Sequence, residues 1–447
     1  MWVQELTLEN IKCFEKIHLK LGTKDAAHNW VTLLGENGGG KSTVLQALGL
    51  LLAGPEGAPK LLTRPAGWLR EENTIGKLSI KIHQGENDPG KFGGAVKERK
   101  AFGYTFFVTG REPLKIRNVT YTEPAIVENK DRIMGWVREN ALTSKGKGWF
   151  AAGFGAFRRL TRRSEIIVPS LQTPERFTNF LTQFHEDEPL AALERWLVYL
   201  DYRIAKGENK QSKTQAEKQR DIGVAAINKL LPQGNRFDSI TSDGRILIDV
   251  RGKKVPTLAL SDGFRSILAM AGDLVWRLLE AFPNSETPLE EEGVVLIDEL
   301  DIHLHPMWQR DIAGWLREQF PNIQFIVATH SPMIAAGAGR DAITYRLIFD
   351  GNQSNISEIK GIAFQSVDKI LMGDAFSLVS PYSPQAEKKI SQYLTLKRKA
   401  RRTPQEENEL QETLPFIEQA FAERDTNSLD YKVQELLREK LAIEAND

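Results

Sequence analysis

The sequence predicts an α/β protein in which short buried strands alternate with helices. An apolar run at 30–34 ends in a glycine-rich segment, which leads into a helix with apolar residues at helical spacing. A second apolar run, at 294–297, ends in two adjacent carboxylates, and a third, at 325–327, leads to a histidine. Short apolar runs that alternate with helices are typical of an open α/β sheet with parallel strands.

The first 122 residues contain this sheet's first strand and a second, antiparallel part. Apolar and polar residues alternate at 2–8 and 17–21, which predicts two further strands before the run at 30–34. The helix after the glycines covers 43–53, and Gly54-Pro55 is expected to end it. Strand-like pieces at 78–82, 104–108 and 114–121 are separated by turn residues, which favours an antiparallel β subdomain.

The rest of the chain alternates between helical and strand-rich regions. Residues 175–231 have helical patterning, apart from the polar stretch 206–221, which we expect to be a mobile hinge or a disordered tip. Strands and helices alternate again from about 246 to 349, and helix start signals follow at Ser383, Thr403 and Ser428. We therefore divide the chain into an N-terminal lobe (1–170), a helical insertion (171–255), a C-terminal lobe (256–350) and a mainly helical region (351–447).

Composition excludes several classes of protein. The 59 basic and 59 acidic residues of the 447 cancel, so any contact with nucleic acid would need a local patch. A single cysteine, Cys13, excludes an internal disulfide, and the first residues lack the pattern of a secretory signal. The longest apolar stretch, near 44–53, is too short to span a bilayer, so we expect a cytoplasmic protein that does not contact a membrane.

The glycine-rich segment has the order that phosphate binding requires. Successive glycines let backbone N–H groups converge on phosphates, and the following helix adds the positive end of its dipole. Lys41 supplies a charge to the same oxygens, and the Ser42 hydroxyl is placed to ligate Mg²⁺. The pattern predicts a P-loop that binds ATP through Gly35, Glu36, Asn37, Gly38, Gly39, Gly40, Lys41, Ser42 and Thr43.

Two carboxylates complete the expected chemistry. Asp298 and Glu299 follow the buried strand 294–297, at the strand end where open α/β sheets bind ligands. Asp298 can hold Mg²⁺, and Glu299 can orient and deprotonate the attacking water.

Two further segments have both an ordinary and a functional interpretation. Ser261 is a good N-cap for the apolar helix that runs to Leu279, and a free helix N-terminus is also an anion site. His330 follows the strand 325–327 by a short step, which places it on a strand end beside the carboxylates. A histidine in such a position is more often structural than catalytic, so the spacing alone leaves both roles open.

These four segments, in this order, resemble those of the ATP-binding-cassette (ABC) ATPases. The resemblance implies a P-loop NTPase fold of the ABC-ATPase type and a dimer in which two chains sandwich two ATP molecules. Ser261, Asp262 and Gly263 would then act across the interface as the signature segment, with Asp301 in the D-loop and His330 as the switch histidine. Asp262 and Phe264 stand where that family has glycine and glutamine.

The segments 5–14, 298–306 and 329–332 are similar to those of soluble OLD-like and RecF/SMC-related ATPases, which are often catalogued as AAA-type. In that family a basic residue of the first segment approaches the nucleotide, which makes Lys12 a candidate, with an exposed lysine at a strand end as the alternative. The glutamine of the Q-loop has no clear counterpart, although Gln172 and Gln183 lie in the right stretch. His303 and His305 form a poor metal set and are expected to be structural.

The segment 153–160 is similar to one in the PtuA-like ATPase subunits of Septu and retron antiphage systems. It contains part of an arginine cluster that could bind nucleic-acid phosphates, although a solvated helix face is the more common meaning of such a cluster: Arg158, Arg159, Arg162 and Arg163. After His330 the chain has no strand-borne D-x-D and no histidine, so a nuclease of the TOPRIM or HNH type would have to be a separate protein.

Three functions compete at this point. The leading one is a dimeric or higher-order ATPase that controls a separately encoded effector, such as an HNH-type nuclease, in antiphage defence. The second is a RecF/SMC-like repair ATPase that binds DNA, with RNA as a further candidate partner. The third, a transporter subunit, is disfavoured by the large insertion between 60 and 250 and by the segment 329–332.

Overall fold

The computed structural model describes residues 1–90, 101–110, 114–116, 119–121, 123–144, 148–156, 175–185, 192–206, 210–231, 235–241 and 245–421. The chain forms two compact units, Met1–Ile370 and Leu371–Asp447. Each unit is described by itself. No helix in the described ranges is long and apolar enough to cross a membrane.

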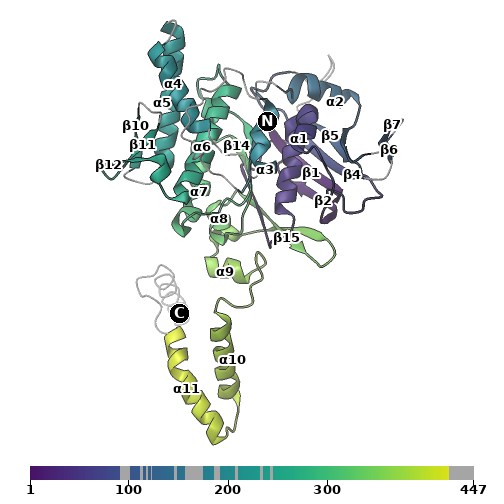
Figure 1. Ribbon diagram of the computed structural model, residues 1–447. Coiled ribbons are helices and arrows are strands. Elements are labelled where there is room, and N and C mark those ends of the chain that lie inside the picture. Colours follow the sequence, from purple (N-terminus) through teal and green to yellow (C-terminus); the bar gives the residue numbers. More distant parts are fainter. Residues whose placement is uncertain are drawn as a thin grey trace, which may run out of the picture. The chain divides into compact units, whose positions relative to one another are not determined.

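A six-stranded sheet, ordered β16-β15-β3-β14-β13-β9, forms the centre of the first unit (Figure 1). Its strands are β3 (Trp30–Gly35), β9 (Phe150–Phe154), β13 (Gly293–Ile297), β14 (Ile323–Ala328), β15 (Ile343–Phe349) and β16 (Ser354–Ile359). All neighbours pair in parallel except β15 and β16. The predicted strands at 30–34, 294–297 and 325–327 are therefore confirmed, and they lie close together although about 260 residues separate the first from the second.

Both faces of this sheet are buried at β3, β9, β13 and β14, which explains why these four strands are largely apolar. Successive side chains of a strand point to opposite faces. Accordingly, Val294 and Leu296 pack in a core with helix α1 (Lys41–Leu61), whereas Val295 and Ile297 pack in a second core with helices α6 (Asp262–Ala281) and α7 (Pro306–Gln319).

The predicted antiparallel subdomain is present and includes the N-terminus of the chain. Its five strands run in the order β2-β1-β4-β5-β8 and share a core with α1. They are β1 (Trp2–Ile11), β2 (Phe14–Lys20), β4 (Gly76–His83), β5 (Ala101–Val108) and β8 (Ile126–Glu128). The expected single strand at 114–121 is instead a small hairpin of β6 (Leu114–Ile116) and β7 (Val119–Tyr121).

The sequence predicts that the helix ends at Gly54-Pro55, but helix α1 continues past this pair. Gly54 is non-helical, with φ of 80°, and the helical path resumes immediately after it. Glycine adopts this φ freely, and proline is well suited to the first turn of the segment that follows. The Gly54-Pro55 pair therefore kinks the helix and lets its second half continue.

The expectation of a mobile or disordered stretch at 206–221 is wrong for its described part. Helices α4 (Ala192–Lys206) and α5 (Lys210–Leu230) pack together, and Ala216 is fully buried. Gly223 lies so close to the Trp196 ring that a Cβ there would be 2.6 Å from it. The polar residues are good helix formers on a solvated face, which explains why composition alone misled.

The expected helical insertion at 171–255 is not helical throughout. It begins with the short helices η2 (Arg176–Phe180) and α3 (Leu181–Phe184) and ends in a three-stranded antiparallel sheet. The strands of this sheet are β10 (Asn235–Ile240), β11 (Ile246–Val250) and β12 (Lys253–Pro256).

The remaining short elements of the first unit connect these layers: α2 (Arg132–Trp136), η1 (Val137–Ala141), η3 (Thr257–Ala259), η4 (Pro288–Glu290), α8 (Pro332–Gly337) and η5 (Ile362–Phe364). A further short helix, α9 (Val367–Met372), spans the boundary between the two units.

The second unit contains α10 (Pro384–Arg398) and α11 (Pro404–Phe421), which pack against each other. The start signals predicted at Ser383 and Thr403 are confirmed. Ser383 Oγ accepts a hydrogen bond from the Ala386 amide, and Thr403 and Glu406 form a reciprocal capping box. The signal at Ser428 lies outside the described residues.

Candidate functional site

The glycine-rich loop follows β3 and leads into α1, as the sequence predicts. Gly38 and Gly40 have φ of 80° and 96°, which strongly favour glycine. A Cβ at Gly40 would lie 2.4 Å from the Phe14 ring, because the β1–β2 turn packs against the loop, whereas the space beside Gly38 is open. The loop is therefore held from one side and leaves its backbone accessible to a phosphate on the other.

Lys41, the first residue of α1, is folded back over this loop. Its Nζ donates to the carbonyl oxygens of Gly35 (2.8 Å) and Glu36 (2.9 Å). Burial lowers the pKa of Lys41, and the nearby carboxylates of Asp298, Glu299 and Asp301 oppose that shift. The lysine is thus a desolvated cation that faces the carboxylates of another strand.

Three strand ends bring the predicted residues together. The strands β3, β14 and β13 are consecutive and parallel, so the P-loop, His330 and Asp298 emerge at the same edge of the sheet. The Asp298 amide donates to the Phe154 carbonyl oxygen (2.8 Å), which ties the end of β13 to that of β9. Glu299 has a left-handed backbone, with φ of 46°, a conformation that non-glycine residues adopt chiefly where the surrounding structure imposes it.

Asp301 connects the carboxylate strand to the histidine strand. One of its carboxylate oxygens accepts hydrogen bonds from the Thr329 hydroxyl (2.5 Å) and the His330 amide (3.1 Å). Burial lowers the pKa of His330, and Lys41 lowers it further, against the opposing effect of the three carboxylates Asp298, Glu299 and Asp301. Lys41, His330 and the three carboxylates therefore lie close enough for their charges to affect the pKa values of Lys41 and His330.

The oxygen donors for a magnesium ion are also suitable. Ser42 is exposed in the first turn of α1, and Asp298 is half-buried at the same edge of the sheet. A hydroxyl and a carboxylate are ligands that Mg²⁺ accepts, together with phosphate oxygens and water. In the described ranges, no group of three or more His, Cys, Asp or Glu side chains could hold another metal ion. His305 instead caps α7, because its Nδ1 accepts from the Met307 amide (3.3 Å).

The signature segment combines exposed and buried residues. Ser261 is the N-cap of α6 and is exposed, but its side chain makes no capping hydrogen bond. Asp262 is also exposed and forms an ion pair with Arg265. Gly263 is buried against its own chain, since a Cβ there would lie 2.2 Å from the His303 carbonyl oxygen. Only the start of this segment is thus available to another molecule.

Lys12 lies beside α1, next to the P-loop. Its Nζ donates to Gln46 Oε1 (3.2 Å) and stands 4.4 Å from the centre of the Trp68 ring, and burial lowers its pKa. Sequence reasoning missed Gln46, which also donates to the Gln183 carbonyl oxygen (2.9 Å). Its position four residues after Ser42, one helical turn along α1, was the available signal.

Other candidate residues are elsewhere or cannot be placed. The Gln183 side chain is buried between Gly49 and Gly153, and within the described part of the chain its amide has no hydrogen-bond partner. Gln172 and the cluster Arg158, Arg159, Arg162 and Arg163 lie outside the described residues.

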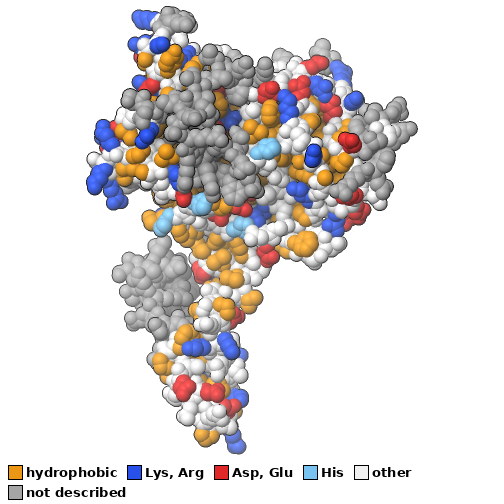
Figure 2. Space-filling model, viewed as in Figure 1, with side chains coloured by type: hydrophobic (Ala, Val, Ile, Leu, Met, Phe, Trp, Pro, Cys, Tyr) orange, Lys and Arg blue, Asp and Glu red, His pale blue; other side chains and the backbone are white. Residues whose placement is uncertain are grey.

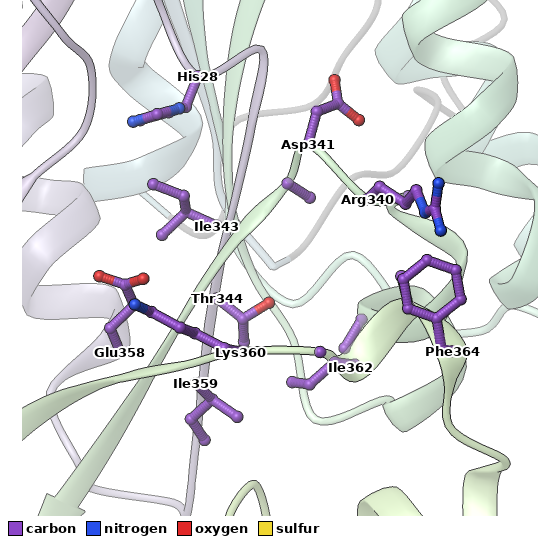
Figure 3. A pocket seen from close by; sticks show the side chains of 15 residues that line it. His28, Arg340, Asp341, Ile343, Thr344, Glu358, Ile359, Lys360, Ile362 and Phe364 are labelled. Atoms are coloured by element: carbon purple, nitrogen blue, oxygen red, sulfur yellow. The ribbon is translucent and has the colours of Figure 1, made fainter.

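A cavity of about 250 Å³ lies at the opposite edge of the central sheet, where β15 begins (Figure 3). Its walls carry charges of both signs, including Asp341, Glu358 and Lys360, and the Arg340 guanidinium lies over the Phe364 ring at 4.5 Å. Burial lowers the pKa of His28 on its rim. Because the glycine-rich loop follows the other end of β3, this cavity is separate from that loop and from Asp298 and His330.

Two family models match the chain. One, described as an AAA domain, matches residues 5–232, which is just over half of the chain. The other is an AAA domain whose description also names the AbiEii toxin and type IV toxin–antitoxin systems, and it matches residues 138–336.

Curated relatives match shorter or more distant stretches. A retron Ec83 probable ATPase of Escherichia coli is 47% identical over 89 residues, which are 20% of this chain and 16% of that protein. The Septu protein PtuA of Bacillus mycoides is 25% identical over 338 residues, which are 75% of this chain and 39% of that protein. The chain therefore spans well under half the length of these relatives.

Among solved structures, an SMC head bound to the C-terminal winged-helix domain of ScpA has a similar fold. The TM-score is 0.50 at 13% identity, and the match covers 80% of this chain and 98% of the other. At this identity the likeness concerns the fold, which is that of a P-loop ATPase head.

Proposed function

The chain belongs to the AAA-domain family, and from this premise we propose that it binds ATP with Mg²⁺ and hydrolyses the ATP to ADP and phosphate. The observation that carries the proposal is the convergence of the P-loop, Asp298, Glu299 and His330 at one edge of the central sheet. That edge is where open α/β sheets bind their ligands.

Each residue has a specific role in this proposal. Backbone amides of 35–43 and the Lys41 ammonium hold the phosphates, while Lys12 lies beside the nucleotide from the β1–β2 turn. Ser42 and Asp298 hold Mg²⁺, which when bound withdraws charge from the phosphate oxygens. Glu299 accepts a proton from the attacking water, and the neutral imidazole of His330 contacts the γ-phosphate region. Asp301 positions His330 through the backbone amide.

We further propose that two chains form a sandwich in which the signature segment of one completes the ATP site of the other. The exposure of Ser261 and Asp262 and the uncapped Ser261 hydroxyl support a contact with a partner's phosphate. Gly263 contributes indirectly, because its packing against His303 places the start of α6 beside the D-loop region.

The likeness to Septu and retron proteins supports a role in antiphage defence, in which the ATPase controls a separately encoded effector such as an HNH-type nuclease. The SMC-head fold supports a second candidate, a RecF/SMC-like repair ATPase that acts on DNA. The two roles differ in whether a partner nuclease is required. A nuclease gene beside this one, and co-purification of its product, would favour defence, whereas repair requires no such effector.

Replacement of the proposed base tests the hydrolytic mechanism. Glu299→Gln keeps the size of the side chain but cannot accept the proton, so hydrolysis should fall by about 10²-fold or more. The variant should still bind ATP and should accumulate as a dimer in size-exclusion chromatography with ATP and Mg²⁺.

The matched control is Glu318→Gln, an identical change at an exposed position of α7, which should retain wild-type hydrolysis. Hydrolysis at the wild-type rate by Glu299→Gln would remove Glu299 from the mechanism. ATP binding without a dimer would leave hydrolysis intact as a proposal but contradict the sandwich.

A further inference from the structure

The outer face of the β10–β12 sheet is a basic surface that the nucleotide site does not use. Its described residues include four cations, Arg236, Arg245, Arg251 and Lys254, and two carboxylates, Asp238 and Asp249. The whole chain has no net charge, so this local excess of cations is not a general property of the protein. Figure 2 shows Lys and Arg side chains gathered where Figure 1 places β10, β11 and β12.

The strand register explains which side chains face outward. Asp249 pairs with Arg236 on one side and with Lys254 on the other, so these three share one face. The opposite face carries Ile246 and Ile248, which are buried in the core. The two carboxylates are already satisfied, since Asp249 pairs with Arg236 (3.3 Å) and Asp238 with Lys254 (2.9 Å).

Much of the positive charge on this face remains accessible. The side chains of Arg236 and Lys254 are 75% and 64% exposed, in spite of their ion pairs. Arg251 is exposed as well, and it forms no ion pair with any residue that the structure describes. Lys253 pairs with Val250 and so belongs to the opposite face. An exposed ion pair adds little stability, so Arg236 and Lys254 can exchange their partners for phosphates at small cost.

The turn between β11 and β12 gives a second, independent indication. Arg251 and Gly252 both have positive φ, 53° and 85°, as a two-residue type I′ hairpin requires. Asn, Asp or Gly is the usual first residue of such a turn, and arginine is strained there. An arginine held at the tip of the hairpin against its conformational preference is better explained by its charge than by the fold.

The single aromatic residue of 235–256 does not belong to this face. Phe237 pairs with Ile248 and packs against the core. Proteins that hold single strands usually stack bases on exposed aromatic side chains, whereas a duplex can be bound through its phosphates alone. The surface therefore fits the backbone of a double helix.

We propose that the outer face of β10–β12, with the Arg251 turn, binds the phosphate backbone of duplex DNA. This face contains none of the residues of the cluster at 158–163. It deepens the proposed function, because β12 leads through η3 directly to Ser261 and thus connects a DNA-binding surface to the signature segment.

The test compares two triple variants of the full chain by fluorescence anisotropy with a labelled 30-base-pair DNA duplex over a series of salt concentrations. In the first, Arg251→Asn keeps the type I′ turn without its charge, and Arg236→Thr and Lys254→Thr suit strand positions on the outer face. This variant should bind about tenfold or more weakly. The slope of log K against log[salt] should fall by roughly one for each phosphate that the variant no longer neutralises.

The control variant removes three lysines from β2 and β4, Lys16→Thr, Lys77→Thr and Lys81→Thr, which, like Arg236 and Lys254, are exposed strand cations with ion pairs. It should bind the duplex as the wild type does. Both triple variants should keep wild-type ATP hydrolysis in the absence of DNA, which separates a failure of this proposal from a failure of the ATPase proposal.

Equal duplex affinity and salt slope in the wild type and the Arg251 triple variant would overturn the proposal. So would tighter binding of a single strand than of a duplex of the same length. If the wild type binds no DNA but the triple variant loses a protein that co-purifies with the wild type, the face is a protein interface instead.

Discussion

At the scale of single residues, two charged side chains, Lys41 and Asp301, form hydrogen bonds that fix the proposed nucleotide site. Lys41 is 6% exposed and donates to two carbonyl oxygens of its own loop. These hydrogen bonds satisfy the ammonium, and in the proposed ATP complex phosphate oxygens replace the carbonyls. Asp301 holds the segment before the histidine, because its Oδ1 accepts hydrogen bonds from both the Thr329 hydroxyl and the His330 amide.

The lowered pKa of His330 predicts a specific dependence of stability on pH. The folded state favours the neutral ring, so the unfolded chain binds more protons at pH values between the folded pKa and the ordinary value of 6.5. The contribution of His330 is therefore fully present above pH 6.5 and is lost as the pH falls below it. Urea unfolding between pH 8 and 5.5 should show a smaller loss in His330→Gln than in the wild type.

The control for this experiment is Asn284→Gln, at an exposed position without a titratable side chain. It should leave the pH dependence unchanged. Parallel stability curves for the wild type and His330→Gln would show that His330 is not kept neutral by the fold.

At the scale of elements, the P-loop is shaped from outside by the β1–β2 turn. Phe14 and Cys13 stand where a Cβ of Gly40 would be, and the Cys13 carbonyl oxygen accepts from the Ser354 amide (2.8 Å). The antiparallel subdomain therefore contacts the loop directly, and β16 contacts the turn. A change in that turn would be transmitted to the phosphate site through van der Waals contact.

Gly40→Ala tests this packing. The added methyl group would meet the Phe14 ring at 2.4 Å in a backbone conformation with φ of 96°, so we expect a loss of unfolding free energy of about 1–3 kcal/mol and much weaker ATP binding. Urea unfolding and nucleotide titration measure the two effects. Gly314→Ala in α7, where nothing lies within 4 Å, should instead stabilise the protein by up to about 1 kcal/mol.

If Gly40→Ala binds ATP as tightly as the wild type, the β1–β2 turn does not restrict the loop. Equal destabilisation by Gly40→Ala and Gly314→Ala would indicate a general intolerance of added methyl groups, and the Phe14 ring would have no special role.

At the scale of the whole molecule, the described residues of one chain present the signature segment and the P-loop on different elements. The P-loop precedes α1, whereas Ser261 precedes α6, and these helices pack in the two different cores on either side of the central sheet. In the proposed sandwich, each ATP site takes its phosphate loop from one chain and its signature residue from the other.

Mixing two inactive variants tests this arrangement. Lys41→Ala removes the phosphate contact, and Ser261→Arg blocks the signature contact, so each variant alone should have very low ATP hydrolysis. A mixed dimer has one site that combines an intact P-loop with an intact signature, and random pairing should restore about a quarter of the wild-type activity. Activity no higher than that of the separate variants would argue against sites shared between chains.

The sequence alone was sufficient to predict the elements that are defined by local order. The glycines at 35–40, the apolar run before Asp298 and the capping signals at Ser383 and Thr403 each depend on neighbouring residues, and all are found in the structure at the expected places. Phosphate binding requires a particular sequence of small and charged residues, so its pattern is visible without a fold.

Only the tertiary structure decided which distant residues meet. Phe14 restricts Gly40, Asp301 fixes His330, and Gln46 links Lys12 to Gln183, although no local pattern connects these residues. Composition also misled at 210–221, where polar residues form the solvated face of a packed helix. The physical reason is that sheet register and packing act over distances of up to hundreds of residues, whereas sequence periodicity reports only on each element and its solvent.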